Sequence, residues 1–292
     1  MAGVNRPFDK ESNVAKIPTV TLNNGLTMPQ LGFGVFQVPD AEAEAAVSTA
    51  LAAGYRSIDT AAIYGNEQGT GAALAASGIA RADLFVTTKL WNGASTKWTA
   101  AAVDREFDAS LNRLGLDYID LYLIHWPHPM REDYLTIWRA FEDIARSGRA
   151  KAVGVSNFQP PQLRRLIAET ELVPAVNQIE LHPRLQQAEL RALHTSLGIA
   201  TEAWSPLGQG SLLTDPVIGK IAAKHGRTAA QVVLNWHLQL GNIVIPKSVT
   251  PSRIRENLDV FDFTLDDQDR TLIAGLDVGT RVGPNPDTFD PK

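Results

Sequence analysis

Short apolar runs alternate with helix-like segments along almost the whole chain, and this alternation limits the possible folds more than any other feature. The predicted strands are Gly32–Val35, Tyr55–Asp59, Leu84–Thr88, Ile119–Ile124, Ala152–Val155, Ala175–Ile179, Ile199–Trp204 and Ile243–Ile245. The predicted helices are Asp40–Ala53, Glu67–Ser77, Thr99–Leu114, Tyr134–Ser147, Pro160–Glu169, Gln187–Ser196, Val217–His225, Thr228–Leu240, Pro251–Asn257 and Leu265–Ala274. Such alternation indicates a parallel sheet covered by helices.

Eight repeats in a chain of 292 residues favour a closed α/β barrel, the (β/α)8 or TIM barrel. A doubly wound open sheet is the alternative. It has less support because Gly32-Phe33-Gly34, in the first strand, is too short to be the Gly-x-Gly-x-x-Gly turn of that fold. We therefore expect one barrel domain over residues 17–292.

Both ends of the chain are expected to add to the barrel. Thr19–Leu22 and Leu26–Met28 flank Asn23-Asn24-Gly25, a turn sequence that predicts an N-terminal β-hairpin. Residues 1–16 are polar, without the apolar run of a secretory signal, and are predicted to form a flexible tail. Arg281–Phe289 has neither helix nor strand periodicity, and we expect it to lie as a C-terminal loop over the active site.

The composition argues against several classes of function. The net charge is −5, so the chain lacks the basic surplus of a nucleic-acid-binding protein. No segment approaches the roughly 18 consecutive apolar residues of a membrane span. The absence of cysteine removes disulfides, thiolate metal sites and a cysteine nucleophile, and fits a reducing compartment. We expect a cytoplasmic protein with no metal, nucleic-acid or membrane partner.

Ionisable residues follow or end three successive predicted strands, namely Asp59, Lys89 and His125, and Tyr64 comes five residues after Asp59. The later strands end near Ser156, Asn157, Gln178, Trp204, Ser205, Lys247 and Ser248. The carboxyl ends of barrel strands meet at one rim, where barrel active sites are built, so this pattern predicts one site. Taken singly, each has a structural alternative: Asp59 could cap a helix, Lys89 could lie in solvent, and His125 could be an ordinary buried imidazole.

The same residues lie in six motifs that closely resemble those of the aldo-keto reductases, in that family's order and spacing from about residue 17 onward. The motifs are Ser57-Ile-Asp59-Thr-Ala-x-x-Tyr64-Gly-Asn-Glu67, Thr88-Lys89-Leu-Trp91, Leu121-x-Leu-Ile-His125-Trp-Pro127, Gly154-Val-Ser156-Asn-Phe158, Asn177-Gln178-x-Glu180 and Ile245-Pro-Lys247-Ser248. The resemblance implies a barrel enzyme that uses NADPH to reduce aldehydes and ketones to alcohols. The segment Trp126–Glu132 is short, which suggests an open pocket, and the chain looks most similar to bacterial members of the 2,5-diketo-gluconate reductase type.

The resemblance also implies roles for the four rim residues. Tyr64 would donate the proton to the carbonyl oxygen, although a free tyrosine has a pKa of about 10. We expect the Lys89 ammonium to lower that pKa and Asp59 to keep the lysine charged and in place. His125 would hydrogen-bond the carbonyl oxygen as charge develops on it.

A larger set is expected to bind NADPH (NADP+). It comprises Gly34, Val35, Ser156, Asn157, Gln178, Trp204, Ser205, Leu207, Gly208, Gln209, Lys247, Ser248, Val249, Thr250, Arg253, Glu256 and Asn257. Many family members have tyrosine where this chain has Trp204, but either ring can stack on nicotinamide. Lys247 and Arg253 near a helix start suit a 2′-phosphate, which favours NADPH over NADH.

The substrate is expected to be a small carbonyl compound bound by a monomer, against a wall formed by Phe36, Trp91, His125 and Trp126. Two other functions remain open. A barrel aldolase would use Lys89 as a Schiff base, for which the adjacent acid Asp59 is unfavourable. A sensor of the same fold would bind NADPH with negligible turnover, and the presence of all four rim residues disfavours it.

Overall fold

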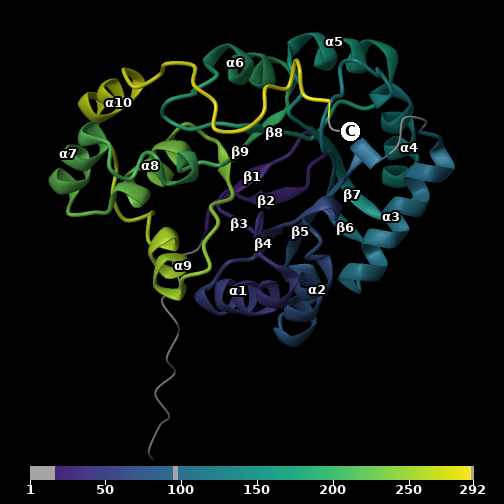
Figure 1. Ribbon diagram of the computed structural model, residues 1–292, viewed down its shortest axis with the longest axis horizontal. Coiled ribbons are helices and arrows are strands. Elements are labelled where there is room, and N and C mark those ends of the chain that lie inside the picture. The colour runs from purple at the N-terminus through teal and green to yellow at the C-terminus, as the bar shows by residue number, and fades with distance from the viewer. Residues whose placement is uncertain (1–16, 95–97, 291–292) are drawn as a thin grey trace, which may run out of the picture.

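The computed structural model describes residues 17–94 and 98–290, which contain an eight-stranded sheet in the order β10-β9-β8-β7-β6-β5-β4-β3, with every pair parallel (Figure 1). The strands are β3 (Phe33–Gly34), β4 (Ser57–Asp59), β5 (Phe85–Leu90), β6 (Ile119–Ile124), β7 (Ala150–Ser156), β8 (Val176–Glu180), β9 (Ala200–Trp204) and β10 (Ile243–Val244). All eight predicted strands are confirmed, with bounds shifted by a few residues. The predicted tail, residues 1–16, lies outside the described residues.

Backbone hydrogen bonds join the two ends of this sheet. Leu31 and Val244 form a parallel bridge. Gly32 N donates to the carbonyl of Val244 at 2.8 Å, and Val244 N donates to the carbonyl of Gln30 at 2.9 Å. The sheet is therefore closed, which confirms the (β/α)8 barrel and excludes an open doubly wound sheet.

Helices surround the barrel in Figure 1. They are α1 (Asp40–Ala53), α2 (Glu67–Ala76), α3 (Ala100–Leu114), α4 (Tyr134–Arg146), α5 (Pro160–Glu169), α6 (Ala188–Leu197), α7 (Pro216–His225), α8 (Ala229–Gln239), α9 (Pro251–Leu258) and α10 (Asp267–Ala274). Short 3-10 turns are η1 (Ala62–Tyr64), η2 (Arg81–Asp83), η3 (Asn92–Ala94) and η4 (Gly208–Gly210). The predicted helices are all present, and their ends agree with the prediction within two residues.

Local side-chain caps explain where two of these helices begin. Thr228 and Gln231 form a capping box at the start of α8, and Asp266 and Asp269 form another at the start of α10. Each box satisfies backbone N–H groups that have no partner inside the helix. The cap at Asp266 places the first residue of α10 two positions later than Leu265, where the sequence pattern begins.

The barrel interior is apolar at its amino end. The cluster found there comprises Leu22, Met28, Phe85, Leu121, Leu123, Ala152, Ala175, Val176 and Ile243. Leu22 and Met28 come from the predicted hairpin, in which β1 (Thr19–Thr21) pairs antiparallel with β2 (Thr27–Pro29). The hairpin thus packs against the amino end of the barrel. The polar residues of the predicted site stand at the opposite, carboxyl end.

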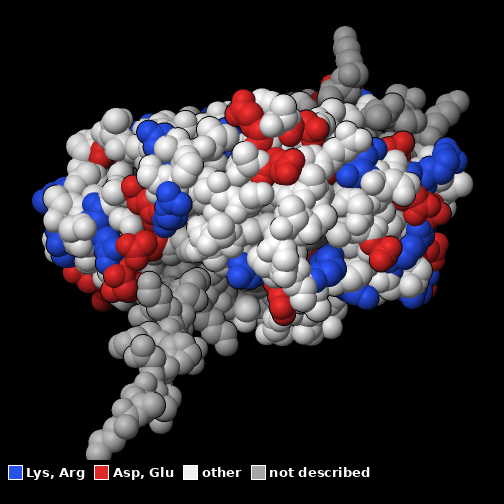
Figure 2. Space-filling model, turned by 90° about the horizontal axis from the view of Figure 1, so that it is seen from below, with Lys and Arg blue, Asp and Glu red and all other residues white. Residues whose placement is uncertain are grey.

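The surface carries charges of both signs. On the face shown in Figure 2, acidic and basic side chains are mixed around the edge, and a largely uncharged area lies between them. Of the helices in the described residues, none has the length and apolar character needed to cross a membrane.

Candidate active site

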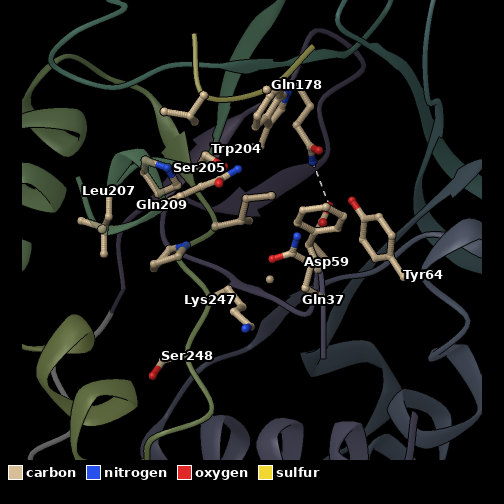
Figure 3. Close-up of a pocket in the computed structure, with 18 of the residues that line it drawn as sticks. Gln37, Asp59, Tyr64, Gln178, Trp204, Ser205, Leu207, Gln209, Lys247 and Ser248 are labelled. Atoms are coloured by element: carbon tan, nitrogen blue, oxygen red, sulfur yellow. Dashed lines mark hydrogen bonds between the residues drawn. The ribbon is translucent and has the colours of Figure 1, made fainter. Parts of the chain in front are cut away.

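A cavity of about 950 Å³ opens where the strands end, and Figure 3 shows part of its lining. Its walls include Gly34, Asp59, Ser156 and Trp204, the last residues of β3, β4, β7 and β9. It brings together most of the residues predicted from the sequence: Gly34, Phe36, Asp59, Tyr64, Trp91, His125, Trp126, Ser156, Asn157, Gln178, Trp204, Ser205, Leu207, Gln209, Lys247, Ser248, Arg253, Glu256 and Asn257.

Five of the predicted residues are outside the lining of this cavity, as far as the described residues go: Val35, Lys89, Gly208, Val249 and Thr250. Val35, Gly208 and Val249 are adjacent in sequence to lining residues, and Thr250 is two residues from Ser248. Lys89 lies beneath the cavity floor against Asp59. The predicted site is therefore one connected region.

Sequence reasoning missed another group of lining residues: Gln37, Ile63, Pro206, Gly210, Leu213, Thr228, Ala229, Ala230, Ile245, Pro246, Val282, Gly283, Pro284 and Phe289. Most lie beside a predicted residue or within the predicted C-terminal loop, so their sequence neighbourhood was a usable signal. The start of α8 (residues 228–230) had no such signal, because only the tertiary fold brings it to the cavity.

Lys89 connects Asp59 and Tyr64. Its Nζ donates to Asp59 Oδ1 at 2.6 Å, to the carbonyl of Thr60 at 2.9 Å and to Tyr64 Oη at 3.5 Å. Lys89 has no exposed surface and Asp59 is 2% exposed. An ammonium has three protons to donate, so these three acceptors fully satisfy the lysine. This arrangement leaves no free, exposed amine for a Schiff base.

The pKa values of Lys89 and Tyr64 follow from this burial and this pairing. Burial lowers the pKa of Lys89, but Asp59 and the other nearby groups raise it more, so the lysine remains charged. Burial raises the pKa of Tyr64, and the opposing effect of Lys89 does not cancel this. The lysine therefore acts in the expected direction, but the expectation of a lowered net pKa for Tyr64 is wrong. Tyr64 is a neutral phenol at neutral pH.

His125 is neutral as well. Burial, followed by the charges of Lys89 and His128, keeps the pKa of His125 well below its usual range. Its ring centroid lies 5.7 Å from that of Tyr64 and 5.5 Å from that of Trp91, both in edge-on geometry. His125 Nδ1 is buried and has no hydrogen-bond partner among the described residues. One imidazole nitrogen carries a proton in the neutral ring, so His125 can donate one hydrogen bond.

Ser156, Asn157 and Trp204 form a hydrogen-bonded part of the cavity lining. Ser156 Oγ donates to the carbonyl of Gln178 at 2.8 Å, and Asn157 Nδ2 donates to the carbonyl of His125 at 3.0 Å. Trp204 Nε1 donates to Asn157 Oδ1 at 2.8 Å, which fixes the indole ring. Asn157 has a φ of 67°, a left-handed conformation that asparagine adopts more readily than most residues.

The far end of the cavity is cationic. Lys247 and Arg253 both line it, are exposed, and form no ion pair or hydrogen bond with any described residue. They flank the start of α9, where no side chain caps the helix. Unpaired cations beside free helical N–H groups are suited to a phosphate. Lys247 and Ser248 are labelled in Figure 3.

The C-terminal loop lies against the cavity, as predicted. Val282, Gly283, Pro284 and Phe289 line it. The backbone N–H groups of Val282 and Gly283 donate to the carboxylate of Glu180. A Cβ on Gly283 would lie 2.4 Å from a ring atom of Trp204, so only glycine allows this close contact.

The residues present fit a nicotinamide dinucleotide. One end of the cavity has amide and hydroxyl groups beside Trp204, and the other has two unpaired cations. A cavity of about 950 Å³ is at the upper end of the roughly 300–1,000 Å³ of ligand pockets. The described residues contain no cluster of three or more His, Asp or Glu side chains able to hold a metal ion.

The fold and the site together define a barrel enzyme with an aspartate, lysine, tyrosine and histidine at its rim. A family model described as "Aldo/keto reductase family" matches residues 28–277. A protein named "Aldo-keto reductase/" from Mycolicibacterium smegmatis is 58% identical over 273 residues, 94% of this chain and 98% of its own. The chain belongs to the aldo/keto reductase family.

Two further comparisons extend this result. A "Methylglyoxal reductase DkgA" from Yersinia pestis is 51% identical over 274 residues, 93% of this chain and 97% of its own. A solved aldo-keto reductase from Bombyx mori, in complex with NADP, is 38% identical with a TM-score of 0.86, covering 92% of this chain and 95% of the other. The DkgA match is consistent with the predicted bacterial diketo-gluconate reductase type.

Proposed function

We propose that this protein is an NADPH-dependent oxidoreductase that reduces small aldehydes and ketones to alcohols. The observation that carries the proposal is the position of Lys89 Nζ, which donates to Asp59 Oδ1 at 2.6 Å and to Tyr64 Oη at 3.5 Å below a cavity that both partners line. Such an arrangement holds a phenolic proton where a carbonyl oxygen can receive it.

NADPH bound in this cavity would supply a hydride to the carbonyl carbon. Tyr64 donates its phenolic proton to the carbonyl oxygen. Lys89 stabilises the phenolate that remains, because its ammonium is close to Tyr64 Oη and is kept charged by Asp59. His125, neutral and beside Tyr64, donates a hydrogen bond to the same carbonyl oxygen and so orients the substrate.

The cofactor is held by groups on opposite ends of the cavity. Ser156, Asn157 and Gln178 are assigned to the nicotinamide carboxamide, and the fixed ring of Trp204 to the nicotinamide face. Lys247 and Arg253 are assigned to the phosphates, including a 2′-phosphate. The same assignment extends to the neighbouring cofactor set: Gly34, Val35, Ser205, Leu207, Gly208, Gln209, Ser248, Val249, Thr250, Glu256 and Asn257.

The substrate lies among aromatic side chains. The ring of Phe36 is 5.1 Å from that of Tyr64, and Phe36 is 47% exposed, so it can contact a ligand that enters the cavity. Trp91 and Trp126 line the same region, and Trp126 packs against Phe289 of the C-terminal loop at 4.3 Å. These walls suit a small carbonyl compound. Because one chain supplies the whole site, we also propose a monomer, and we place it in the cytoplasm.

The experiment is the loss of NADPH absorbance with a panel of aldehydes, ketones and keto-sugars that includes methylglyoxal. Tyr64→Phe should reduce turnover by about a hundredfold or more, the usual size of general acid catalysis, with NADPH affinity unchanged. Equal turnover in wild type and Tyr64→Phe would refute the role of Tyr64. Tight NADPH binding with no turnover of any substrate would favour the sensor, and borohydride trapping of substrate on Lys89 would favour the aldolase.

A further inference from the structure

The barrel interior contains a buried acid that the proposed mechanism does not use. Glu202 lies in the middle of β9 and has no exposed surface. Its strand neighbours in register are Gln178 on β8 and Ile243 on β10. Interior positions of barrel strands are usually occupied by aliphatic side chains, and burying a carboxyl group costs free energy unless it is hydrogen-bonded. A carboxyl group here therefore requires a specific explanation.

Glu202 shares a hydrogen-bond donor with Asp59. The amide nitrogen of Gln178 donates to Glu202 Oε2 at 2.8 Å and to Asp59 Oδ2 at 2.8 Å. An amide NH₂ has two protons, so these two carboxyl groups use both of them. Figure 3 shows the bond from Gln178 to Asp59.

This sharing fixes the orientation of the Gln178 amide. If the amide were turned over, its oxygen would lie against the Asp59 carboxylate, so that hydrogen bond would become a repulsive contact and the amide protons would lose both carboxyl acceptors. With its nitrogen held, Gln178 presents its oxygen as the acceptor left for the cavity, and no described residue donates to it. A single acid would hold one of the two protons, whereas two acids hold both.

Glu202 also interacts electrostatically with Lys89 and Tyr64. The charged and titratable groups around it are Asp59 from β4, Lys89 from β5 and Tyr64 from η1. Burial, followed by the charge of Asp59, raises the pKa of Glu202 to about 8, against smaller opposite effects of Gln178 and Lys89. Once ionised, Glu202 raises the pKa of Lys89 and of Tyr64. The protonation state of Glu202 therefore changes the pKa of the proton donor, Tyr64.

We propose that Glu202 is a positioning residue, which with Asp59 holds the amide of Gln178 in its cofactor-binding orientation and couples its own charge to the Lys89–Tyr64 pair. This rests on the proposed function, since Gln178 is assigned there to the nicotinamide carboxamide. The acid is accordingly expected to affect cofactor affinity and the pH dependence of proton donation, beyond any effect on folding.

The test compares Glu202→Leu, which removes the acceptor, with Glu202→Gln, whose amide oxygen can still accept from Gln178. Dissociation constants for NADPH are measured by isothermal titration calorimetry on the full chain at pH 7. We expect Glu202→Leu to bind about tenfold more weakly and Glu202→Gln to stay within about threefold of wild type, in line with the loss or retention of one buried hydrogen bond. Glu142→Gln, a buried glutamate on α4 remote from the cavity, is the matched control and should bind as wild type does.

A second measurement, the pH dependence of kcat/KM, tests the effect of the Glu202 charge on Tyr64. In wild type, kcat/KM for reduction should fall as pH rises through about 8, because ionised Glu202 makes Tyr64 a weaker acid. Glu202→Gln removes that ionisation, so the fall should move to higher pH, an effect that a purely structural side chain would not produce.

The outcomes separate this proposal from the proposed function. Wild-type NADPH affinity in Glu202→Leu would overturn the positioning role, and an unchanged pH profile in Glu202→Gln would overturn the coupling. Should Glu202→Leu fail to fold, NADPH affinity is measured in Glu202→Met, which also removes the acceptor, and the pH profile of Glu202→Gln still decides the coupling. If wild type binds NADPH but reduces no carbonyl compound, the proposed function fails, while the affinity comparison still tests the effect of Glu202 on the site.

Discussion

Replacement of Lys89 by methionine tests the central ion pair most directly. Methionine has a similar length and no charge, so Lys89→Met removes the cation that Asp59 contacts at 2.6 Å in the barrel interior. Asp59 would then keep Gln178 as a donor but would have no counter-charge. Breaking a buried ion pair by removing one partner costs about 3–5 kcal/mol.

The size of the loss should depend on pH. Without the lysine, Asp59 can avoid a buried unpaired charge by taking up a proton. For an aspartate with the ordinary pKa of about 3.9, the free-energy cost of this protonation is about 4 kcal/mol at pH 7 and about 1.5 kcal/mol at pH 5. The folded variant would then bind one proton more than its unfolded chain, so its stability falls as pH rises. The gap to wild type should therefore widen by about 1.4 kcal/mol per pH unit.

The assay is urea unfolding of both proteins at pH 5, 6 and 7, with the free energy of unfolding compared at each pH. Titrations that both proteins share cancel in the difference. Lys220→Met, at an exposed position on α7, is the control and should leave stability unchanged. A gap below about 1 kcal/mol at pH 7 would refute the ion-pair reasoning. A large gap that is equal at pH 5 and pH 7 would refute the protonation of Asp59.

Three further predictions concern the cavity. Arg253→Ala should weaken NADPH binding by about tenfold or more and NADH binding much less, because the loss is one of charge-assisted contacts to a 2′-phosphate; equal losses in titrations with the two cofactors would contradict that assignment. Gly283→Ala should displace the C-terminal loop, since the new Cβ would lie 2.4 Å from Trp204, and should raise KM for small aldehydes with little change in Tm. Because its pKa lies well below the usual range, His125 should give no inflection near pH 6.5 in kcat/KM, and such an inflection, lost in His125→Asn, would show that it titrates.

The fold was largely predictable because its signal is periodic. Each apolar run is followed by a helix, and the closure of the barrel follows from the number of repeats. The approximate position of the site was predictable for the same reason, since residues such as Asp59 and His125 stand where strands end. The direction of the net shift in the pKa of Tyr64 was not predictable. It depends on how deeply the ring is buried, and a sequence motif does not give the burial of a side chain.

Glu202 escaped notice for a different reason. It lies inside a predicted strand, Ile199–Trp204, whose mostly apolar residues are typical of core packing, whereas the predicted site residues stand mainly at strand ends. The available signal for Glu202 was an ionisable residue in the middle of a strand predicted to be buried. Its partner could not be read from the sequence, because the register that puts Gln178 opposite Glu202 is set by the pairing of β8 with β9.

The charge balance of the barrel interior explains why so many ionisable groups can lie together away from water. At neutral pH, Lys89 is positive and is paired with Asp59, while Glu202, His125 and Tyr64 are neutral. The cluster thus contains one compensated pair and no net charge, which avoids the cost of an unpaired buried ion. The first group expected to disturb this balance as pH rises is Glu202, whose pKa is about 8. Loss of activity on the alkaline side should therefore begin with the acid beside Gln178, before the phenol itself ionises.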